Sequence, residues 1–451
     1  MKRFNLLLLV TSSLIWSVAA IAATRPHYGG TLRITLRETP QTIEPAELAQ
    51  AGASNVTRLI FNTLVILDDR GQPQPSLATS WQVEPGNQRW RFSVRTGVSF
   101  SDGTPLNATA VAASLRSANP EWKVLPSGDS VVIESGVPNL DLPAELALAR
   151  NAIALGGQQP VGTGPFVVSQ WLPGKHLTVT ANDQYWDGRP FVDSIEIEFG
   201  RNDREQLTAL DLGRADISEV APENIRRARA DGRTLVTSAP TELLALVFSA
   251  PPRSEEEIHA RNALAISIDT SAINNVVLQG GGEPTGALLP NWLSGYQFVF
   301  STPTNLERAR QERSQAKQAT SAVLGYNALD PVAHTIAERV LLNARDAGIT
   351  LQLTTAGHLD MLLVRIPIAS SDPQTALTEL AKALKLPQPK FTNSSVTEHY
   401  SAEEALLQSR QVIPLLHLRT GAAIRTNLRD FSILPDGSWR LDNVWLAAEK
   451  P

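Results

Sequence analysis

Segments in which apolar residues occupy alternate positions recur along most of the chain, and segments with helix start signals lie between them. The stretch YGGTLRITLRE places Leu32, Ile34 and Leu36 on one face, and RWRFSVR at 89–95 repeats this pattern. A period of two is typical of a strand with one buried face. Strands mixed with helices in this way predict an α/β architecture with several lobes.

Helix signals become denser in the second half of the chain. Ser254 followed by Glu257 predicts a capping box ahead of a helix. The stretch 330–348, with proline at its first helical position and glycine at its end, predicts a long helix. The glycine-rich stretch at 278–290 lacks the Lys-Ser/Thr pair and the strand-before-helix context of a phosphate-binding loop, so it is predicted to be a flexible connection.

The 451-residue chain contains no cysteine. No disulfide can therefore hold the fold together, and its stability has to come from core burial. The length is sufficient for two or three domains, each with a core of its own. A net charge of −5 argues against a nucleic-acid-binding protein, because such a protein carries a basic surface.

The first 23 residues predict a secretory signal peptide. A basic start at Lys2 and Arg3 precedes an apolar stretch, and small residues then offer cleavage after Ala22 or Ala23. An uncleaved membrane anchor is the alternative, and the short apolar run weighs against it. Since no cysteine can carry a lipid, we expect a soluble, monomeric, periplasmic protein that is not a lipoprotein.

Motifs for catalysis or metal binding are missing from the sequence. The seven histidines lack metal-ligand spacing and no cysteine can assist them, so we expect no metal site and no cofactor. Ser314 and Lys317 match the S-x-x-K pattern of penicillin-interacting serine enzymes, but the accompanying motifs are absent or in the wrong order. We therefore expect a protein that is not an enzyme.

The stretch VGTGPFVVSQWLPGKHLTVTANDQYWDGRP at 161–190 sets turn-forming residues around aromatic clusters and holds no nucleophile. Its TGP element at 163–165 is predicted to set a crossing of the backbone. Aromatic residues beside turns are usually part of a core, so Tyr185, Trp186 and Phe191 are predicted to pack rather than to contact a ligand. The predicted role of this stretch is to build the scaffold.

Five blocks in the same order resemble family 5 extracellular solute-binding proteins, the peptide and nickel class that serves ABC importers. YGGTLRI at 28–34 is similar to the first strand of the family. The stretch 59–115, with its LATSW element and its DGTPL turn, is similar to the most specific block. The remaining blocks are VGTGPF with NDQYWDGRPFVDSIEIEF, then LTALDLGRADISEV, then the stretch 261–290.

The resemblance implies a two-lobed periplasmic-binding-protein fold made of three interleaved domains, with a ligand cleft between the lobes. Domain I, the first lobe, would comprise 24–45, 160–246 and a C-terminal return at 421–451. Domain II would be an insert at 46–159, and domain III, the second lobe, would run from 247 to 420. Compared with the family, the insert and the stretch 385–411 are short.

The implied function is that of the periplasmic substrate-binding component of an ABC importer. The protein would capture an oligopeptide or similar small solute and deliver it to an inner-membrane ABC permease. Two alternatives remain open at this point. The solute could be a non-peptide such as a sugar or a metal chelate, or the shortened chain could be an envelope interaction protein or hydrolase that no longer serves transport.

The cleft is predicted to be walled by the loop after the first strand, by two aromatic residues in LLPNWLSGYQF, and by a strand end in the second lobe. These residues are Glu38, Thr39, Gln41, Thr42, Trp292, Tyr296, Arg365, Ile366 and Ser370. Aromatic residues with polar tips suit a half-buried pocket wall, and ordinary packing of the second lobe is their alternative role.

Peptide-binding members of the family carry an acidic residue that grips the ligand amine, ahead of an acidic-Pro pair. In VRIPIASSDPQTAL this pair is Asp372-Pro373, the amine-gripping position is Ala369 and the aromatic position is Ile366. Arg365 offers instead a forked cation suited to an anion, with a role as a surface cation as the alternative. The resemblance thus predicts that N-acetylated peptides bind at least as well as free ones, unless Glu38 takes the amine.

Overall fold

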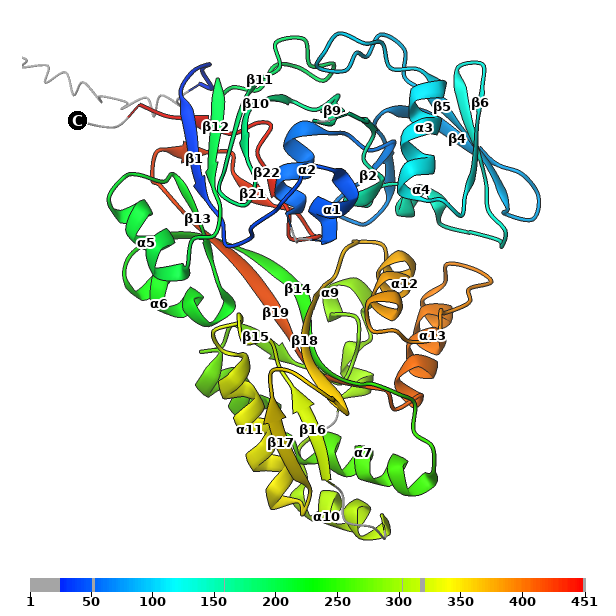
Figure 1. Ribbon diagram of the computed structural model, residues 1–451, viewed down its shortest axis with the longest axis vertical. Helices are drawn as coiled ribbons and strands as arrows, with labels where there is room; N and C mark the ends of the chain where they lie inside the picture. The colour runs from blue at the N-terminus through cyan, green and yellow to red at the C-terminus, as the bar shows by residue number, and fades with distance from the viewer. Residues whose placement is uncertain (1–24, 51–52, 158, 302, 317–320, 449–451) are drawn as a thin grey trace, which may run out of the picture.

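The computed structural model describes residues 25–50, 53–157, 159–301, 303–316 and 321–448, and the predicted signal peptide at 1–23 lies outside them. Figure 1 shows an upper and a lower lobe, each built of strands covered by helices, which confirms the predicted α/β fold. The upper lobe holds the start and the end of the described chain. The lower lobe is formed by the middle of the second half.

One mixed sheet of eleven strands extends through both lobes in the order β10-β11-β12-β1-β13-β19-β14-β18-β16-β17, with β15 paired to β19. Its strands are β1 (Thr31–Thr35), β10 (Phe166–Leu172), β11 (His176–Ala181), β12 (Ser194–Glu198), β13 (Ile217–Val220), β14 (Thr234–Phe248), β15 (Gly282–Pro284), β16 (Ser321–Gly325), β17 (Thr350–Thr354), β18 (Met361–Pro367) and β19 (Val412–Ile424).

Five smaller sheets complete the β-structure of the described residues. A four-stranded sheet in the order β4-β5-β7-β6 belongs to the insert, and the other four are two-stranded. Their strands are β2 (Val65–Leu67), β3 (Pro73–Pro75), β4 (Ala78–Val83), β5 (Arg89–Val94), β6 (Lys123–Ser127), β7 (Ser130–Glu134), β8 (Ala154–Leu155), β9 (Val161–Gly162), β20 (Leu428–Arg429), β21 (Ser432–Ile433), β22 (Trp439–Arg440) and β23 (Trp445–Leu446).

The helices cover these sheets, and none in the described parts of the chain is long and apolar enough to cross a membrane. They are α1 (Pro45–Gln50), α2 (Ser54–Ile60), α3 (Ala108–Ala118), α4 (Leu142–Glu145), η1 (Ala149–Asn151), α5 (Asp203–Asp211), η2 (Pro222–Asn224), α6 (Ile225–Ala230), α7 (Glu255–Ser267), α8 (Thr270–Ala272), η3 (Ile273–Val277), α9 (Asn291–Ser294), η4 (Gln297–Phe300), α10 (Leu306–Gln315), α11 (Ala333–Asp346), α12 (Pro373–Ala383) and α13 (Val396–Gln408).

The long antiparallel pair β14 and β19 runs from the upper lobe into the lower one (Figure 1). Its register shifts around Pro240, which pairs with Arg419 between Thr237 and Glu242. Proline has no backbone N–H to give to the ladder, so the sheet is locally weakened at this place. The two lobes are therefore joined by continuous strands with an irregular middle, which is a suitable place for a hinge.

Separate hydrophobic cores belong to the two lobes and to the insert. The core of the first lobe combines residues between 32 and 61 with others at 152–217 and 422–444, whereas the core of the insert begins at Leu64. Two further cores lie between 243 and 418. Helices α1 and α2 pack in the first lobe, although the predicted insert starts at residue 46. The boundaries at 45/46, 159/160, 246/247 and 420/421 stay predictions.

Asn62 organises the scaffold stretch around 161–190. Its amide oxygen accepts hydrogen bonds from the Thr163 hydroxyl and from the Trp186 indole N–H, both at 3.1 Å, and its amide nitrogen donates to the Tyr185 hydroxyl at 3.2 Å. A Cβ on Gly164 would lie 2.5 Å from the carbonyl carbon of Ile60, so the backbones cross closely there. The predicted crossing is confirmed.

The glycine-rich stretch at 278–290 was predicted to be a flexible connection, and this prediction is wrong. Residues 282–284 form β15, which pairs with β19. Gly281 would place a Cβ 2.2 Å from the carbonyl oxygen of Pro222, so the backbone has to approach without a side chain. The glycines therefore serve close packing next to the hinge strands.

The long helix predicted from residue 330 begins three residues later. It is α11, which starts at Ala333 with Val332 as its N-cap. The Asp330 carboxylate instead accepts a hydrogen bond from the Val332 N–H at 3.1 Å and lies 3.5 Å from the Arg365 guanidinium. Asp330 therefore forms a turn ahead of the helix and faces Arg365 on β18. The predicted end at Gly348 is confirmed by its positive φ of 79°.

Candidate ligand-binding interface between the lobes

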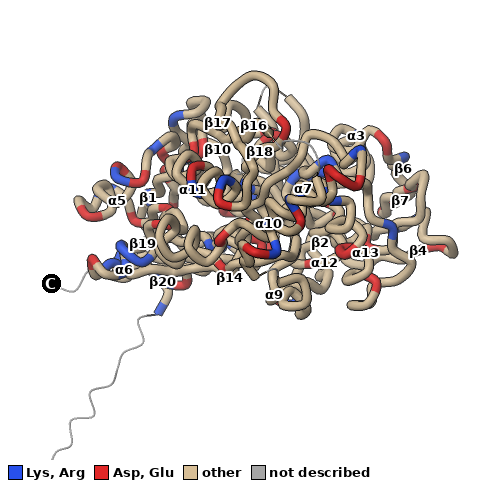
Figure 2. Tube along the Cα trace, turned by 90° about the horizontal axis from the view of Figure 1, so that it is seen from below, with Lys and Arg blue, Asp and Glu red and all other residues tan. Residues whose placement is uncertain are grey.

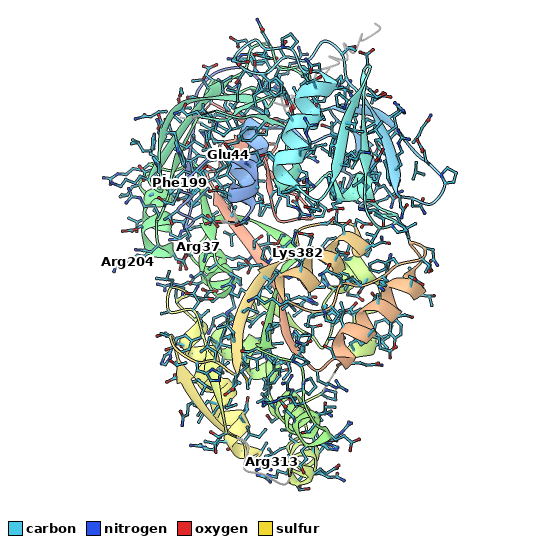
Figure 3. All side chains as sticks on the ribbon, turned by 45° about the vertical axis from the view of Figure 1, so that its right-hand side comes forward. Arg37, Glu44, Phe199, Arg204, Arg313 and Lys382 are labelled. Carbon is cyan, nitrogen blue, oxygen red and sulfur yellow. The ribbon has the colours of Figure 1, made fainter. Side chains whose placement is uncertain are left out.

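The two lobes meet on both sides of the hinge strands. On one side the loop after β1 reaches the junction, and on the other α12 lies beneath α1 and α4 (Figure 1). Figure 3 labels Arg37 and Lys382 at the level where the upper lobe passes into the lower one. Figure 2 shows acidic and basic residues interspersed over the face seen from below, without a continuous basic stripe.

Arg37 carries positive charge from the end of β1 to the hinge side of the interface. Its backbone N–H donates to the Glu219 carboxylate at 2.9 Å, and its guanidinium lies 3.6 Å from the same carboxylate. Asp203 at the start of α5 is 3.9 Å away. The sequence analysis did not single out Arg37, because an arginine next to a strand carries no signal of its partners.

Arg365 is already paired within the protein. Its guanidinium donates to the Glu242 carboxylate at 2.6 and 3.1 Å, and Asp330 lies 3.5 Å away on the other side. Two half-buried carboxylates therefore neutralise this cation. These pairs weigh against Arg365 as a free binding group for a ligand anion, and that role stays a prediction. The strand pairing of β14 with β18 explains them, because it places Leu244 beside Arg365 and Glu242 two residues along.

Glu38 lies directly beyond Arg37, in the loop predicted to wall the cleft. Burial, together with the charge of Glu219, raises the pKa of Glu38 to about 8, although Arg37 opposes this shift. Burial also raises the pKa of Glu223 on η2. Glu38 and Glu223 thus add to the carboxyl groups that act on the Arg37 and Arg365 guanidinium groups.

The other predicted members of the cleft wall in the loop after β1 are at least partly exposed to solvent. Thr39 and Gln41 are exposed, and the Gln41 amide donates to the Thr39 carbonyl at 2.7 Å. The Thr42 hydroxyl accepts a hydrogen bond from the Glu44 N–H at 3.0 Å. These contacts shape the loop and leave the role of its side chains toward a ligand as a prediction.

The far side of the interface closes at the segment 369–371 of the second lobe. In this position Gly71 of the insert approaches Ser371 so closely that a Cβ would lie 2.1 Å from the Ser371 carbonyl oxygen. A cavity of about 30 Å³ remains there. Its lining comes from both lobes and consists of Arg58, Leu67, Ala147, Leu148, Ala369, Ser370, Ser371, Leu434, Pro435 and Asp436.

Two of the predicted site residues, Ile366 and Ser370, lie on this side. Ser370 lines the small cavity, is only 2% exposed, and its hydroxyl accepts from the Asp372 N–H at 3.1 Å. Ile366 packs against the core of the second lobe. Ala369 is exposed and also lines the cavity, so the position aligned with the amine-gripping carboxylate faces the interface without a charge.

The two predicted aromatic wall residues, Trp292 and Tyr296, contact different parts of the protein. The half-buried Trp292 donates its indole N–H to the Pro240 carbonyl in the hinge strand at 2.8 Å. Tyr296 is 8% exposed and packs edge-on against Phe300 and Tyr400 inside the second lobe. Packing is therefore the observed role of Tyr296, whereas Trp292 connects α9 to the hinge.

An ion pair joins the insert to the second lobe. The Arg150 guanidinium on η1 makes two hydrogen bonds to the Glu379 carboxylate on α12, one of them at 3.1 Å, and both side chains are 18% exposed. Arg150 also lies 3.3 Å from Glu145. These residues are 229 positions apart in the chain, so only the tertiary structure could reveal the pair.

We expect Arg150→Ala to weaken the closed arrangement of the lobes. A bidentate, largely buried pair exceeds an exposed one in strength, so ligand affinity should fall about threefold to thirtyfold. Calorimetry on the variant and on Arg89→Ala, whose guanidinium pairs within the insert with Glu84 and Glu134, would measure this. Equal losses in both variants would contradict a role of Arg150 in closure.

The serine of the S-x-x-K pattern, Ser314, lies on helix α10. The Ser314 hydroxyl donates to the Gln311 carbonyl within α10 at 2.7 Å, and Lys317 lies outside the described residues. Among the described residues, no three acidic or histidine side chains are grouped so that they could hold a metal ion.

A cavity of about 270 Å³ lies within the second lobe, away from these interface contacts, and is lined among others by Arg261, Thr285 and Leu415.

Comparison with solved structures defines the class of protein. The binding protein AgaA from A. tumefaciens R10, solved with agropinic acid, superimposes with a TM-score of 0.79, covering 93% of this chain and 99% of that one at 19% identity. Two lobes joined by paired strands thus form the fold of a periplasmic binding protein.

The sequence comparisons specify the family. The model of the bacterial extracellular solute-binding proteins, family 5 middle, matches residues 72–383. The chain therefore belongs to the family 5 extracellular solute-binding proteins, as its sequence blocks predicted.

Two curated relatives are similar over different lengths. The uncharacterized protein YhjP of Bacillus subtilis is 34% identical over 178 residues, which are 36% of this chain and 31% of that protein. The probable D,D-dipeptide-binding periplasmic protein DdpA of Escherichia coli is 21% identical over 71% of this chain and 69% of its own length.

Proposed function

We propose that this protein is the periplasmic substrate-binding component of an ABC importer. It captures a small solute, such as an oligopeptide, between its lobes and delivers it to an inner-membrane permease. The predicted signal peptide at 1–23 and the absence of cysteine support export without a lipid anchor. Membership of the family supports binding without catalysis.

The observation that carries the proposal is the contact of the two lobes at segment 369–371. Residues from the first lobe, the insert and the second lobe meet there around one small cavity. Because β14 and β19 pass continuously between the lobes, opening at this side requires only bending at the hinge. A ligand that contacts both lobes would favour the closed arrangement by its differential affinity for the two states.

The relatives of this protein differ in the solutes that their names give. The name of DdpA refers to a dipeptide, and AgaA was solved with agropinic acid, so related folds carry different solutes. The predicted wall residues Glu38, Thr39, Gln41, Thr42, Trp292 and Ser370 remain the proposed surroundings of the ligand. Arg365 and Tyr296 would support this wall through their partners.

Closure can be measured by fluorescence energy transfer in Ser127→Cys/Lys390→Cys, because the chain has no other cysteine to label. Both positions are exposed, one in the insert and one in the second lobe. We expect at least one solute in a panel of di- to pentapeptides, sugars and nickel–histidine to raise both energy transfer and Tm. If no member of such a panel changes either quantity, the proposed function is contradicted.

A further inference from the structure

The cavity within the second lobe is separate from the cavity between the lobes, since the two share no lining residue. Its volume is about 270 Å³, against about 30 Å³ at segment 369–371. Pockets for small molecules begin at about 300 Å³, so the space suits a compact ligand. Its walls include parts of α7, α13 and β19 in the lower lobe (Figure 1).

Apolar residues form one wall of this cavity. The segment 412–415 of β19 contributes four buried residues, which are Val412, Ile413, Pro414 and Leu415. Leu407 of α13 and Val299 also belong to the lining, and Val299 is 52% exposed, so it marks the open rim. The apolar body of a ligand would remove this wall from water, which is favourable.

The charged residues of the lining are all basic. Arg261 and Arg410 line the cavity, and among the described residues no aspartate or glutamate does. The Arg261 guanidinium is buried and donates to the Glu257 carboxylate at 2.6 Å, so its charge is compensated inside the protein. Arg410 is therefore the cation that the cavity offers to a ligand.

Arg410 has a fixed backbone and a free side chain. Directly after α13 it adopts a left-handed φ of 53°, a conformation usually taken by glycine at a helix end. Its N–H donates to the Leu407 carbonyl at 3.2 Å, and its own carbonyl oxygen accepts from the Arg261 guanidinium at 2.8 Å. Within the described parts of the chain, the exposed Arg410 guanidinium has no hydrogen-bond or ion-pair partner. The fold thus presents an uncompensated cation beside an apolar wall.

Two polar side chains add hydrogen-bonding groups to the lining. Asn262 of α7 and Thr270 of α8 are half-buried, and their side chains make no hydrogen bond to another described residue. Each of them can donate and accept. An apolar wall with a few polar groups that fix the orientation of a ligand is the usual form of a small-molecule site.

We propose that this cavity binds a small organic acid, whose carboxylate pairs with Arg410 and whose apolar body lies against the segment 412–415 of β19. A guanidinium binds a carboxylate through two parallel hydrogen bonds, and a neutral head group would forgo this pairing. The site is independent of the solute held between the lobes and thus goes beyond the proposed function.

Matched fluorinated probes test the two halves of the site. Fluorophenylpropanoate carries both groups, fluorophenylpropanamide lacks the charge, and trifluoroacetate lacks the apolar body. Each would be titrated with the unmodified mature protein and followed by fluorine NMR. We expect fluorophenylpropanoate to bind at least about fivefold more tightly than either of the other two. Equal binding of the amide, or no binding of the propanoate, would overturn the inference.

A charge-removing variant places the carboxylate on the protein. Arg410→Gln should weaken fluorophenylpropanoate about fivefold or more and leave the amide unchanged, because only the acid uses the charge. Arg345→Gln is the matched control, since this exposed arginine on α11 of the same lobe does not line the cavity. Equal losses in the two variants would show a general charge effect and contradict the assignment to Arg410.

A charge-adding variant tests the rim of the cavity. Val299→Asp would place a like charge beside the bound acid and should weaken fluorophenylpropanoate more than the amide. Val396→Asp is its control, because Val396 is 63% exposed in the same lobe and lies outside the lining. If Val299→Asp binds the acid as well as Val396→Asp does, the acid does not occupy this cavity.

Energy transfer between labels at 127 and 390 separates this site from the one between the lobes. Fluorophenylpropanoate should bind without changing it. If the acid raises energy transfer and still binds to Val299→Asp, it lies between the lobes, so the inference is wrong and the proposed function stands. If it binds in the cavity while no solute of the wider panel closes the lobes, the inference stands and the proposed function fails.

Discussion

Replacing Glu403 with alanine is expected to lower the free energy of unfolding by about 3 kcal/mol. The Glu403 carboxylate is completely buried on α13, and one of its oxygens accepts hydrogen bonds from the backbone N–H groups of Leu288 and Leu289, the latter at 3.0 Å. Each buried N–H left without an acceptor costs about 1–3 kcal/mol. Chemical denaturation monitored by tryptophan fluorescence would measure the loss.

The neighbouring Glu404 offers a matched control. Its side chain is half-buried and accepts one long hydrogen bond of 3.4 Å from the Tyr400 hydroxyl. Glu404→Ala should therefore cost less than about 1 kcal/mol. If both alanine variants unfold at the same denaturant concentration, the hydrogen bonds of Glu403 to residues 288 and 289 do not stabilise the second lobe.

Glu403→Gln should separate the hydrogen bonds from the charge, because it keeps an acceptor for both N–H groups. Burial raises the pKa of Glu403 to about 7 in the folded protein, above the usual value of a carboxyl group. The folded state thus binds this proton more tightly, and the stability that it contributes is lost as pH rises from about 4.5 to about 7. Glu403→Gln should therefore be less destabilising at pH 8 than at pH 5.

Gly71→Ala is expected to reduce ligand affinity at least about tenfold while the empty protein keeps most of its stability. The added Cβ would lie 2.1 Å from the Ser371 carbonyl oxygen in the closed arrangement, and backbone cannot yield as a flexible side chain does. Separation of the lobes at this side would remove the overlap, so the variant should penalise closure selectively. Tenfold corresponds to about 1.4 kcal/mol, which is modest for an overlap of this kind.

Positive φ at Gly71 adds a strain that has to be controlled. Gly71 has φ of 74° and Gly97, also in the insert, has φ of 77°, but a Cβ on Gly97 would meet no atom within 4 Å. Both alanine variants share a backbone cost of about 1–2 kcal/mol, and only Gly71→Ala obstructs the second lobe. Energy transfer between labels at 127 and 390 should therefore rise with ligand in Gly97→Ala and not in Gly71→Ala. A normal rise in Gly71→Ala would show that this contact is not part of the ligand-bound state.

Much of the fold could be predicted from interactions between residues that are close in the sequence. The Ser254 side chain caps α7 as predicted, and Asn107 caps α3 in the same way, because capping depends on groups only three residues away. The Glu257 carboxylate accepts a hydrogen bond from the Arg253 N–H, so the reciprocal half of the predicted capping box is not formed. The alternation of Trp90, Phe92 and Val94 gives a strand whose three residues are buried. Turn-forming residues in the stretch 161–190 likewise predicted a scaffold, although its anchor Asn62 was not foreseen.

By itself the sequence determined the α/β class, the caps, the strand faces and the family, since these depend on neighbours in the chain and on ordered blocks. Only the tertiary structure decided which charges meet. The sequence offered Arg365 as a cation for a ligand anion, but its guanidinium is paired with Glu242, 123 positions earlier, and the buried Oε2 of Glu223 has no hydrogen-bond partner. Charges act over several ångströms of space regardless of chain separation, so the fold that brings β1, η2, β14 and β18 together sets the electrostatic character of the interface.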